Sequence, residues 1–157
     1  MRGLLSRRRL VASIGVSPII LNSPAVSSRS AAPPLEPIQQ PANGTDIALI
    51  ERAFEMRQLA LEKGDQAYGA VVAKDGVVIG QSWSRVIIDQ DPTGHAEMSA
   101  IRDASLRLGS RHLTGAVLYS SSPPCPMCEA AAYWAGIQRL VSSRNVNDLG
   151  PPKLCGA

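Results

Sequence analysis

Two cysteines and one histidine in this chain have the spacing of metal ligands. Cys125 and Cys128 are separated by two residues, and His95 lies about 30 residues upstream. If a helix begins at Pro126, the two sulfurs lie one turn apart and can face one ion. The unpaired N–H groups at such a helix start are expected to lower the pKa of both thiols. Because thiolates and imidazole are preferred zinc ligands, the pattern predicts a bound Zn²⁺, one per chain.

Glu97 supplies the carboxylate that a hydrolytic zinc site needs. Three protein ligands are typical of a catalytic zinc and leave one position open to water. Residues two apart do not share a helix face, so we expect Glu97 beside the metal and not bound to it as His95 is. From there it can take a proton from water and pass it to a leaving group. A structural site would need a fourth ligand, and the candidates, His112 and Cys155, have no paired spacing.

Together the motifs resemble those of a known enzyme superfamily. The segments Asp91-Pro-Thr-Gly-His-Ala-Glu-Met98, Pro124-Cys-Pro-Met-Cys128 and Tyr133-Trp-Ala135 are similar to the cytidine/deoxycytidylate deaminases, which are zinc deaminases of nucleosides and nucleobases. Within the superfamily they resemble the branch of guanine deaminase and tRNA adenosine deaminase. The resemblance extends over residues 46–157, and the Cys-Pro-Met-Cys and Tyr-Trp-Ala pieces favour guanine deaminase.

The resemblance implies an activity and a role for each motif residue. It implies a hydrolase acting on cyclic amidines, which deaminates a nucleobase or related small heterocycle and releases ammonia. Guanine is the first candidate substrate. His95, Cys125 and Cys128 match the zinc ligands, and Glu97 matches the proton shuttle. A Cys-x-x-Cys pair alone can be a redox pair or a structural zinc knuckle, and His-x-Glu alone is common. Both motifs, in this order and each at a predicted helix start, favour the deaminase-type site.

The resemblance also implies substrate contacts and reveals departures from the family pattern. Ser84 and Arg85 stand where relatives carry an asparagine that bonds the base or sugar, and proline replaces glutamate at position 123. The elements that close the pocket of guanine deaminases after the fourth strand are expected to be missing, so these motifs do not decide which base is the substrate. The implied contacts are the backbone near Ala96, Gly69 and Ala70, the acid Asp148, and Trp134, which we expect to pack in the core or at a subunit contact.

Apolar periodicity and turn residues predict alternating helices and strands. A helix with a buried stripe (Ile47, Ile50, Phe54, Leu61) is followed by a hairpin around Asp75-Gly76. Two strand-helix-strand crossovers then place helix starts at one sheet edge, which gives an α/β fold with a mixed sheet. The resemblance implies the three-layer α/β/α fold of cytidine deaminase. The expected helices are 46–63, 95–108 (capped by Thr93 or Asp91) and 126–135, and the expected strands are 68–74, 77–83, 116–120 and, as the last, 138–142.

The first 45 residues differ in composition from the remainder. Residues 1–32 contain five arginines and no acid, with Arg7-Arg8-Arg9 followed by an apolar run, and resemble a cleavable twin-arginine signal segment. This favours export, to the periplasm if the chain is bacterial; an organelle transit peptide and a plain tail in a cytoplasmic protein are the alternatives. The segment is too short for a stable membrane span. Residues 33–45 have the composition of a Pro-rich linker, which leaves 46–157 as the deaminase domain.

Charge separates the candidate functions. Five of the sixteen basic residues lie in the first 32, so residues 33–157 carry eleven bases against thirteen acids, a net charge of about −2. This weighs against nucleic acid as partner and favours a small-molecule nucleobase or heterocycle substrate. A tRNA adenosine deaminase and a non-catalytic zinc-binding module remain the alternatives. The resemblance implies a homodimer.

Overall fold

The computed structural model describes residues 35–154. The signal segment predicted over residues 1–32 and the third cysteine, Cys155, lie outside this part, and export stays a prediction. The predicted linker is held against the domain, because the Gln40 side-chain amide donates to the Val78 carbonyl and its oxygen accepts from the Val78 amide at 2.8 and 2.9 Å. No helix within residues 35–154 is long and apolar enough to cross a membrane.

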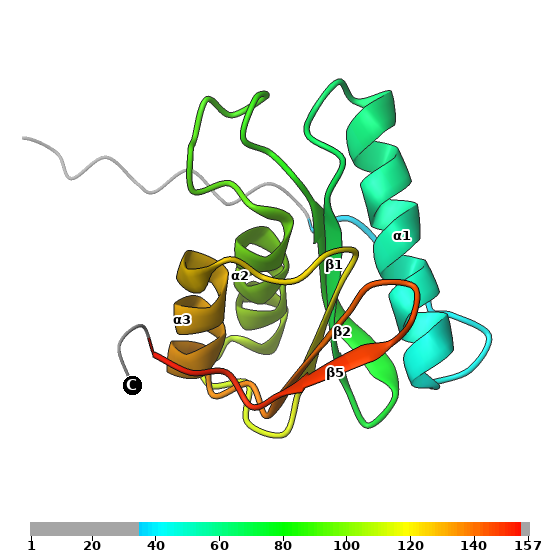
Figure 1. Ribbon diagram of the computed structural model, residues 1–157, viewed down its shortest axis with the longest axis vertical. Helices are drawn as coiled ribbons and strands as arrows, with labels where there is room; N and C mark the ends of the chain where they lie inside the picture. The colour runs from blue at the N-terminus through cyan, green and yellow to red at the C-terminus, as the bar shows by residue number, and fades with distance from the viewer. Residues whose placement is uncertain (1–34, 155–157) are drawn as a thin grey trace, which may run out of the picture. The chain divides into compact units, whose positions relative to one another are not determined.

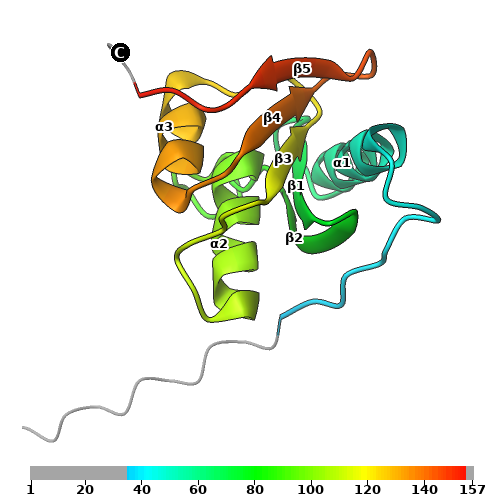
Figure 2. The ribbon, with the colours of Figure 1, turned by 90° about the horizontal axis from the view of Figure 1, so that it is seen from below.

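A mixed five-stranded sheet with helices on both faces forms the fold (Figures 1 and 2). The order is β2-β1-β3-β4-β5; β1 is antiparallel to β2 and β3, β3 is parallel to β4, and β5 is antiparallel to β4. This confirms the predicted α/β class with a mixed sheet. The elements are α1 (Asp46–Glu62), β1 (Gly69–Lys74), β2 (Val77–Trp83), α2 (Ala96–Leu108), β3 (Val117–Ser120), α3 (Pro126–Ala135), β4 (Arg139–Ser142) and β5 (Asn147–Gly150).

Alternating strand residues build two cores, one on each sheet face. Leu118 packs with α2 and α3 on one face, whereas its neighbour Tyr119 packs under α1 on the other. The same alternation separates Leu140 from Val141, since successive side chains of a strand point to opposite faces. Figure 2 shows α1 on one side of the strands and α2 and α3 on the other, which is the three-layer arrangement expected.

The buried stripe of α1 differs from the expected one. Thr45 caps the helix as predicted, because its hydroxyl oxygen accepts from the Ala48 amide at 3.3 Å. However, Ile47 and Leu61 are exposed. The sequence holds apolar residues on more than one side of this helix, and the sheet selects only one of them. The residues that face the sheet are Leu49, Ile50, Ala53, Met56 and Ala60.

The prediction of a last strand at 138–142 was wrong, because β5 follows it. Asn and Asp are uncommon in strands, and residues 147–150 show no alternation of apolar and polar residues, so the local sequence does not predict β5. It forms because the edge of β4 offers backbone partners, pairing Val141 with Asp148 and Ser142 with Asn147. The hairpin turn at Asp75-Gly76 was found correctly, and both residues have the positive φ (51° and 77°) that its turn type needs.

Candidate metal centre and active site

Both ligand motifs lie where a helix begins, at one edge of the sheet. Strands β2 and β3 both run antiparallel to β1, so they point the same way, and each leads into a helix. The starts of α2 and α3 therefore lie on the same side of the molecule (Figure 1). His95 is the residue before the first turn of α2, and Cys125 holds the same position in α3.

The prediction that Thr93 or Asp91 caps α2 was wrong. The Asp91 carboxylate accepts hydrogen bonds from the Thr93 amide and hydroxyl, both at 2.8 Å, and forms a local turn.

The three predicted ligand atoms lie together in the geometry of a zinc site. The distances between the Cys125 and Cys128 sulfurs, and from each sulfur to Nδ1 of His95, are all 3.6 Å. Zinc bonds of about 2.3 Å to sulfur and about 2.0 Å to nitrogen in a tetrahedron put the ligand atoms about 3.5–3.8 Å apart. The donor set and its spacing thus fit Zn²⁺. Within residues 35–154 this is the one group of three or more metal-binding side chains.

Burial governs the electrostatics of the centre. Cys128 is fully buried, and burial raises the pKa of its thiol, an effect that the neighbouring Glu97 increases. The prediction that the helix start lowers this pKa is therefore wrong for Cys128. When only the groups of the protein act, desolvation raises the pKa by more than the helix start lowers it. A metal cation supplies the charge that favours the thiolate, so a cation is needed to complete this set of ligands.

Glu97 lies beside the ligand cluster, as predicted. The side chain is 5 % exposed, in the first turn of α2, and its Oε2 accepts from the Cys128 thiol at 3.6 Å. Burial raises the pKa of the Glu97 carboxyl, and the neighbouring backbone and His95 only partly oppose that effect. Carboxyl groups with a raised pKa can hold a proton near neutrality, which is what a group that alternates between acid and base requires.

A cavity of about 340 Å³ opens next to these side chains. His95, Glu97 and Cys125 form one wall, so a molecule in the cavity reaches both the ligand cluster and the carboxylate. The family resemblance pointed to the segment Tyr68-Gly69-Ala70, of which Tyr68 lines the cavity, but assigned no substrate contact to the other lining residues. Ser122 and Pro123 could have been found from their position directly before the cysteine motif, whereas no local signal marks Gln66. The remaining lining residues are Gln66, Tyr68, Ser122 and Pro123.

Three of the implied substrate contacts, Gly69, Ala70 and Ala96, take part in the fold itself. The Gly69 amide donates to the Ser121 hydroxyl at 3.1 Å, and the Gly69 carbonyl accepts from the Ser121 amide at 2.9 Å. Ala70 is fully buried and belongs to the core under α2. Ala96 is also fully buried, in the first turn of α2. None of the three lines the 340 Å³ cavity, and their substrate roles stay predictions.

Asp148 and Trp134 lie away from the cavity. Asp148 is exposed on β5 and bonds Arg139 at 3.1 Å, where it borders a different hollow. Trp134 is 71 % exposed and its ring meets that of Tyr133 edge-on, so the expectation of core packing was wrong. Most residues of α3 are apolar, so the helix cannot turn all of them inward, and its buried residues are Cys128, Ala132 and Ala135. The subunit contact and the homodimer stay predictions.

Fold and site together define a zinc-binding α/β domain. Residues 44–144 match the family described as cytidine and deoxycytidylate deaminase zinc-binding region, and the chain belongs to that family. This confirms the predicted superfamily and the zinc-binding character of the domain.

Relatives of two activities are similar to this chain. Guanine deaminase of Bacillus subtilis is 48 % identical over 68 residues, which are 43 % of this chain and 44 % of that protein. The tRNA-specific adenosine deaminase of Aquifex aeolicus is 39 % identical over 94 residues, 60 % of this chain and 62 % of that protein. The crystal structure of B. subtilis guanine deaminase superposes with a TM-score of 0.59 at 38 % identity, covering 60 % of this chain and 61 % of that one. The chain thus spans between 44 % and 62 % of the length of these relatives.

Proposed function

We propose that this chain hydrolytically deaminates an amino-substituted heterocycle of the nucleobase type, with guanine as the first candidate. The observation that carries the proposal is the convergence of three metal-ligating atoms, spaced 3.6 Å apart, with a buried carboxyl group at the wall of one small cavity. A purely structural zinc site needs neither the carboxylate nor the cavity. The 48 % identity to guanine deaminase over 68 residues supports the choice of base.

Glu97 is the residue that moves protons in this proposal. When bound, zinc supplies Lewis-acid chemistry that lowers the pKa of water toward neutrality. Glu97 accepts a proton from the water that adds to the amino-bearing ring carbon and donates it to a ring nitrogen of the substrate. It then takes the remaining hydroxyl proton of the adduct and donates it to the amine, so that ammonia leaves as the ring carbonyl forms. Burial raises the pKa of the Glu97 carboxyl, and this makes it a better proton acceptor than an exposed glutamate.

The lining residues outside the metal centre can orient the ring. Tyr68 offers an aromatic face and a hydroxyl, and the Gln66 amide can both donate to and accept from the polar edge of a heterocycle. Ser122 adds a hydroxyl to the lining. Ser84, which stands at the position where relatives carry asparagine, is fully buried and lies outside the cavity lining, so base selection here rests on different side chains.

A Glu97→Gln substitution tests the proposal. We expect the zinc-loaded variant to keep its metal, measured by elemental analysis, and to lose at least about a hundredfold in turnover. The assay is ammonia release from guanine, adenine, cytosine, their nucleosides and amino-triazines. Glu129→Gln is the matched control, since Glu129 also lies in a first helical turn but accepts from the Lys153 amide outside the cavity. Unchanged turnover in Glu97→Gln, or a zinc-loaded wild type inert on every compound, would favour the non-catalytic module.

Transfer RNA is the second candidate substrate, and the 39 % identity to a tRNA-specific adenosine deaminase favours testing it. The negative net charge of residues 33–157 weighs against it. Inosine formation in a tRNA anticodon stem-loop, with affinity that falls steeply as salt rises, would replace the free-base assignment.

A further inference from the structure

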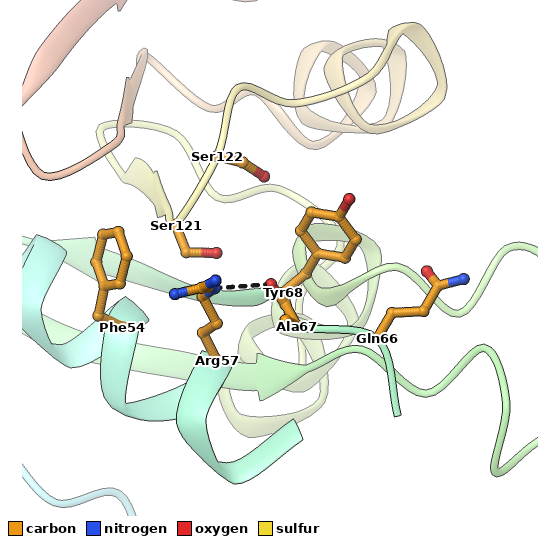
Figure 3. A pocket seen from close by; sticks show the side chains of 7 residues that line it. All are labelled: Phe54, Arg57, Gln66, Ala67, Tyr68, Ser121 and Ser122. Atoms are coloured by element: carbon orange, nitrogen blue, oxygen red, sulfur yellow. Dashed lines mark hydrogen bonds between the residues drawn. The ribbon is translucent and has the colours of Figure 1, made fainter. Parts of the chain in front are cut away.

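Gln66 and Tyr68, two lining residues of the 340 Å³ cavity, belong to the short loop between α1 and β1. Both also line an adjoining hollow of about 700 Å³, so this lining loop (residues 65–68) borders both spaces. Figure 3 shows the loop at the hollow, where Nε of Arg57 in α1 donates to the Ala67 carbonyl at 2.9 Å. The position of the lining loop therefore sets where a ring in the cavity meets Gln66 and Tyr68.

A second loop leads directly into the metal centre. Residues 84–94 follow β2 and end beside His95, one of the three metal-ligating residues. This histidine loop closes on itself, since the Arg85 amide donates to the Gly94 carbonyl at 2.8 Å. Nε of Arg85 also donates to the Asp89 carboxylate at 2.6 Å. These internal bonds make the histidine loop a firm support next to the metal.

The carboxylate of Asp65 joins the two loops. Its Oδ2 accepts from the Ile87 and Ile88 amides of the histidine loop, both at 3.0 Å, and its Oδ1 accepts from the Gln66 amide at 2.7 Å. Asp65 is buried, and hydrogen bonds to a charged group are strong where water is excluded. One side chain thus ties the lining loop to the loop that carries the metal-ligating histidine.

The helix before it does not explain why an acid stands at position 65. The Asp65 amide still donates to the Ala60 carbonyl at 2.9 Å, so the residue lies at the C-terminal end of α1, where negative charge is disfavoured. Burial also opposes its charge, yet hydrogen bonds, those from the Ile88 and Gln66 amides among them, outweigh burial and hold the pKa of Asp65 below its usual value. The carboxylate is therefore stabilised by the contact between the loops and not by the helix.

We propose that Asp65 is a positioning residue for substrate binding, whose carboxylate fixes the lining loop to the histidine loop and so sets where Gln66 meets a ring at the metal centre. The proposal rests on the proposed deaminase function, because it concerns the same cavity. Asp65 lines neither the cavity nor the hollow, so it acts through Gln66. Glu97 and the metal ligands belong to α2, α3 and the residues that begin them, so releasing the lining loop weakens binding more than it slows the chemical step.

Asp65→Ala, which removes the link between the loops, tests the proposal in the zinc-loaded chain. For the best substrate among guanine, adenine, cytosine and amino-triazines, we expect KM to rise at least about tenfold, kcat to fall by less than about threefold and the zinc content to stay the same. A role in stability alone would lower the melting temperature and leave KM unchanged. Asp65→Asn keeps the side-chain shape and one accepting oxygen, so it should raise KM about threefold or more, and it carries the test if Asp65→Ala fails to fold.

Asp91→Asn is the matched control within the histidine loop. Both hydrogen bonds that Asp91 accepts from Thr93 end at the same oxygen, Oδ1, so an amide side chain keeps them. This variant removes a carboxylate charge without breaking the link between the loops, and its KM should stay within about twofold of wild type. An unchanged KM in both Asp65 variants overturns the proposal. An equal rise of KM in Asp91→Asn does so too, because the effect would then come from the lost charge.

A double-substitution cycle shows whether Asp65 acts through Gln66. Gln66 is exposed, so Gln66→Ala should fold. We expect the variant with both Asp65→Ala and Gln66→Ala to have a KM within about twofold of Asp65→Ala alone, because the contact with Gln66 is already lost. Two rises in KM that multiply would place the action of Asp65 elsewhere and would refute the positioning role.

Equilibrium binding separates this inference from the proposed activity. Dialysis of labelled guanine or cytosine against the zinc-loaded Glu97→Gln chain, with and without Asp65→Ala, reports affinity without turnover. An affinity that falls about tenfold with Asp65→Ala, in a protein whose wild type deaminates none of the compounds, refutes the activity and keeps the positioning role. Deamination with a KM that does not respond to Asp65 does the reverse. A wild type that neither binds nor deaminates any of the compounds refutes both.

Discussion

The metal centre and the Asp46–Arg139 cluster both join segments that are far apart in the sequence, but only the second pairs its acids with a cation of the protein. Asp46, at the start of α1, accepts from Arg139 of β4 at 2.8 Å and from the Tyr119 hydroxyl of β3 at 2.6 Å. Hydrogen bonds from Arg139 hold the pKa of Asp46 below its usual value. Asp148 adds a second carboxylate to the same guanidinium group. The cluster needs nothing from outside the chain.

The metal centre shows the opposite electrostatic pattern. Burial raises the pKa of Glu97, and it raises that of the Cys128 thiol as well. No arginine or lysine among residues 35–154 pairs with Glu97. The chain thus places acidic groups out of water without a protein cation, which is costly unless a metal joins them. The difference teaches that acids paired with a protein cation hold elements together, whereas buried acids without such a cation indicate a site for a ligand.

Removing one sulfur from the metal centre should have the largest effect of the three substitutions. We expect Cys128→Ala to bind no zinc and to lose turnover completely, because two ligands do not hold a catalytic zinc. Zinc at a hundred times its dissociation constant should stabilise the wild type by about 3 kcal/mol, and a chelator should remove that gain. The melting temperature of Cys128→Ala should not respond to the chelator. Cys155→Ala, the control, should behave as wild type; if it too loses zinc, the ligand set is different.

Gly69→Ala should have the next largest effect and decides between packing and substrate binding at that position. A methyl group on Gly69 would lie 2.2 Å from two backbone atoms of α1, the Ala53 carbonyl oxygen and the Arg57 amide nitrogen. We expect the free energy of unfolding in urea to fall by about 3 kcal/mol. Trp134→Ala, the exposed control, should change it by less than about 0.5 kcal/mol. Unchanged stability of Gly69→Ala with a raised KM would instead restore the substrate role.

Asp46→Asn should have the smallest effect and should leave the activity intact. Both partners are about one-third exposed, so solvent screening limits the loss to about 1 kcal/mol at pH 7. Because the folded-state pKa of Asp46 is lowered, its contribution is present above the unfolded value of about 3.9 and is lost as the pH falls through the folded value. Denaturant unfolding of wild type and variant should therefore converge below about pH 4. A loss of turnover in the variant would show that the two clusters are coupled.

The sequence by itself determined the parts of this protein that depend on local patterns and on motif chemistry. The ligands His95, Cys125 and Cys128, the neighbouring Glu97 and most helix and strand positions follow from spacing, caps and turns, because these act within a few residues. The buried face of α1 could not be predicted, since it depends on which stripe meets the sheet. The same holds for β5, which forms only because the edge of β4 pairs with it.

Only the tertiary structure decided what surrounds the metal ligands. Gln66, Tyr68 and Ser122 come from two loops more than 50 residues apart, and no local signal joins them to His95. The exposure of Trp134, the pairing of Asp148 with Arg139 and the placement of Arg57 and Arg144 around Phe54 are likewise set by packing. Spacing along the chain fixes which residues can bind a metal, but the shape and charge of a cleft arise from segments that meet only in the folded chain.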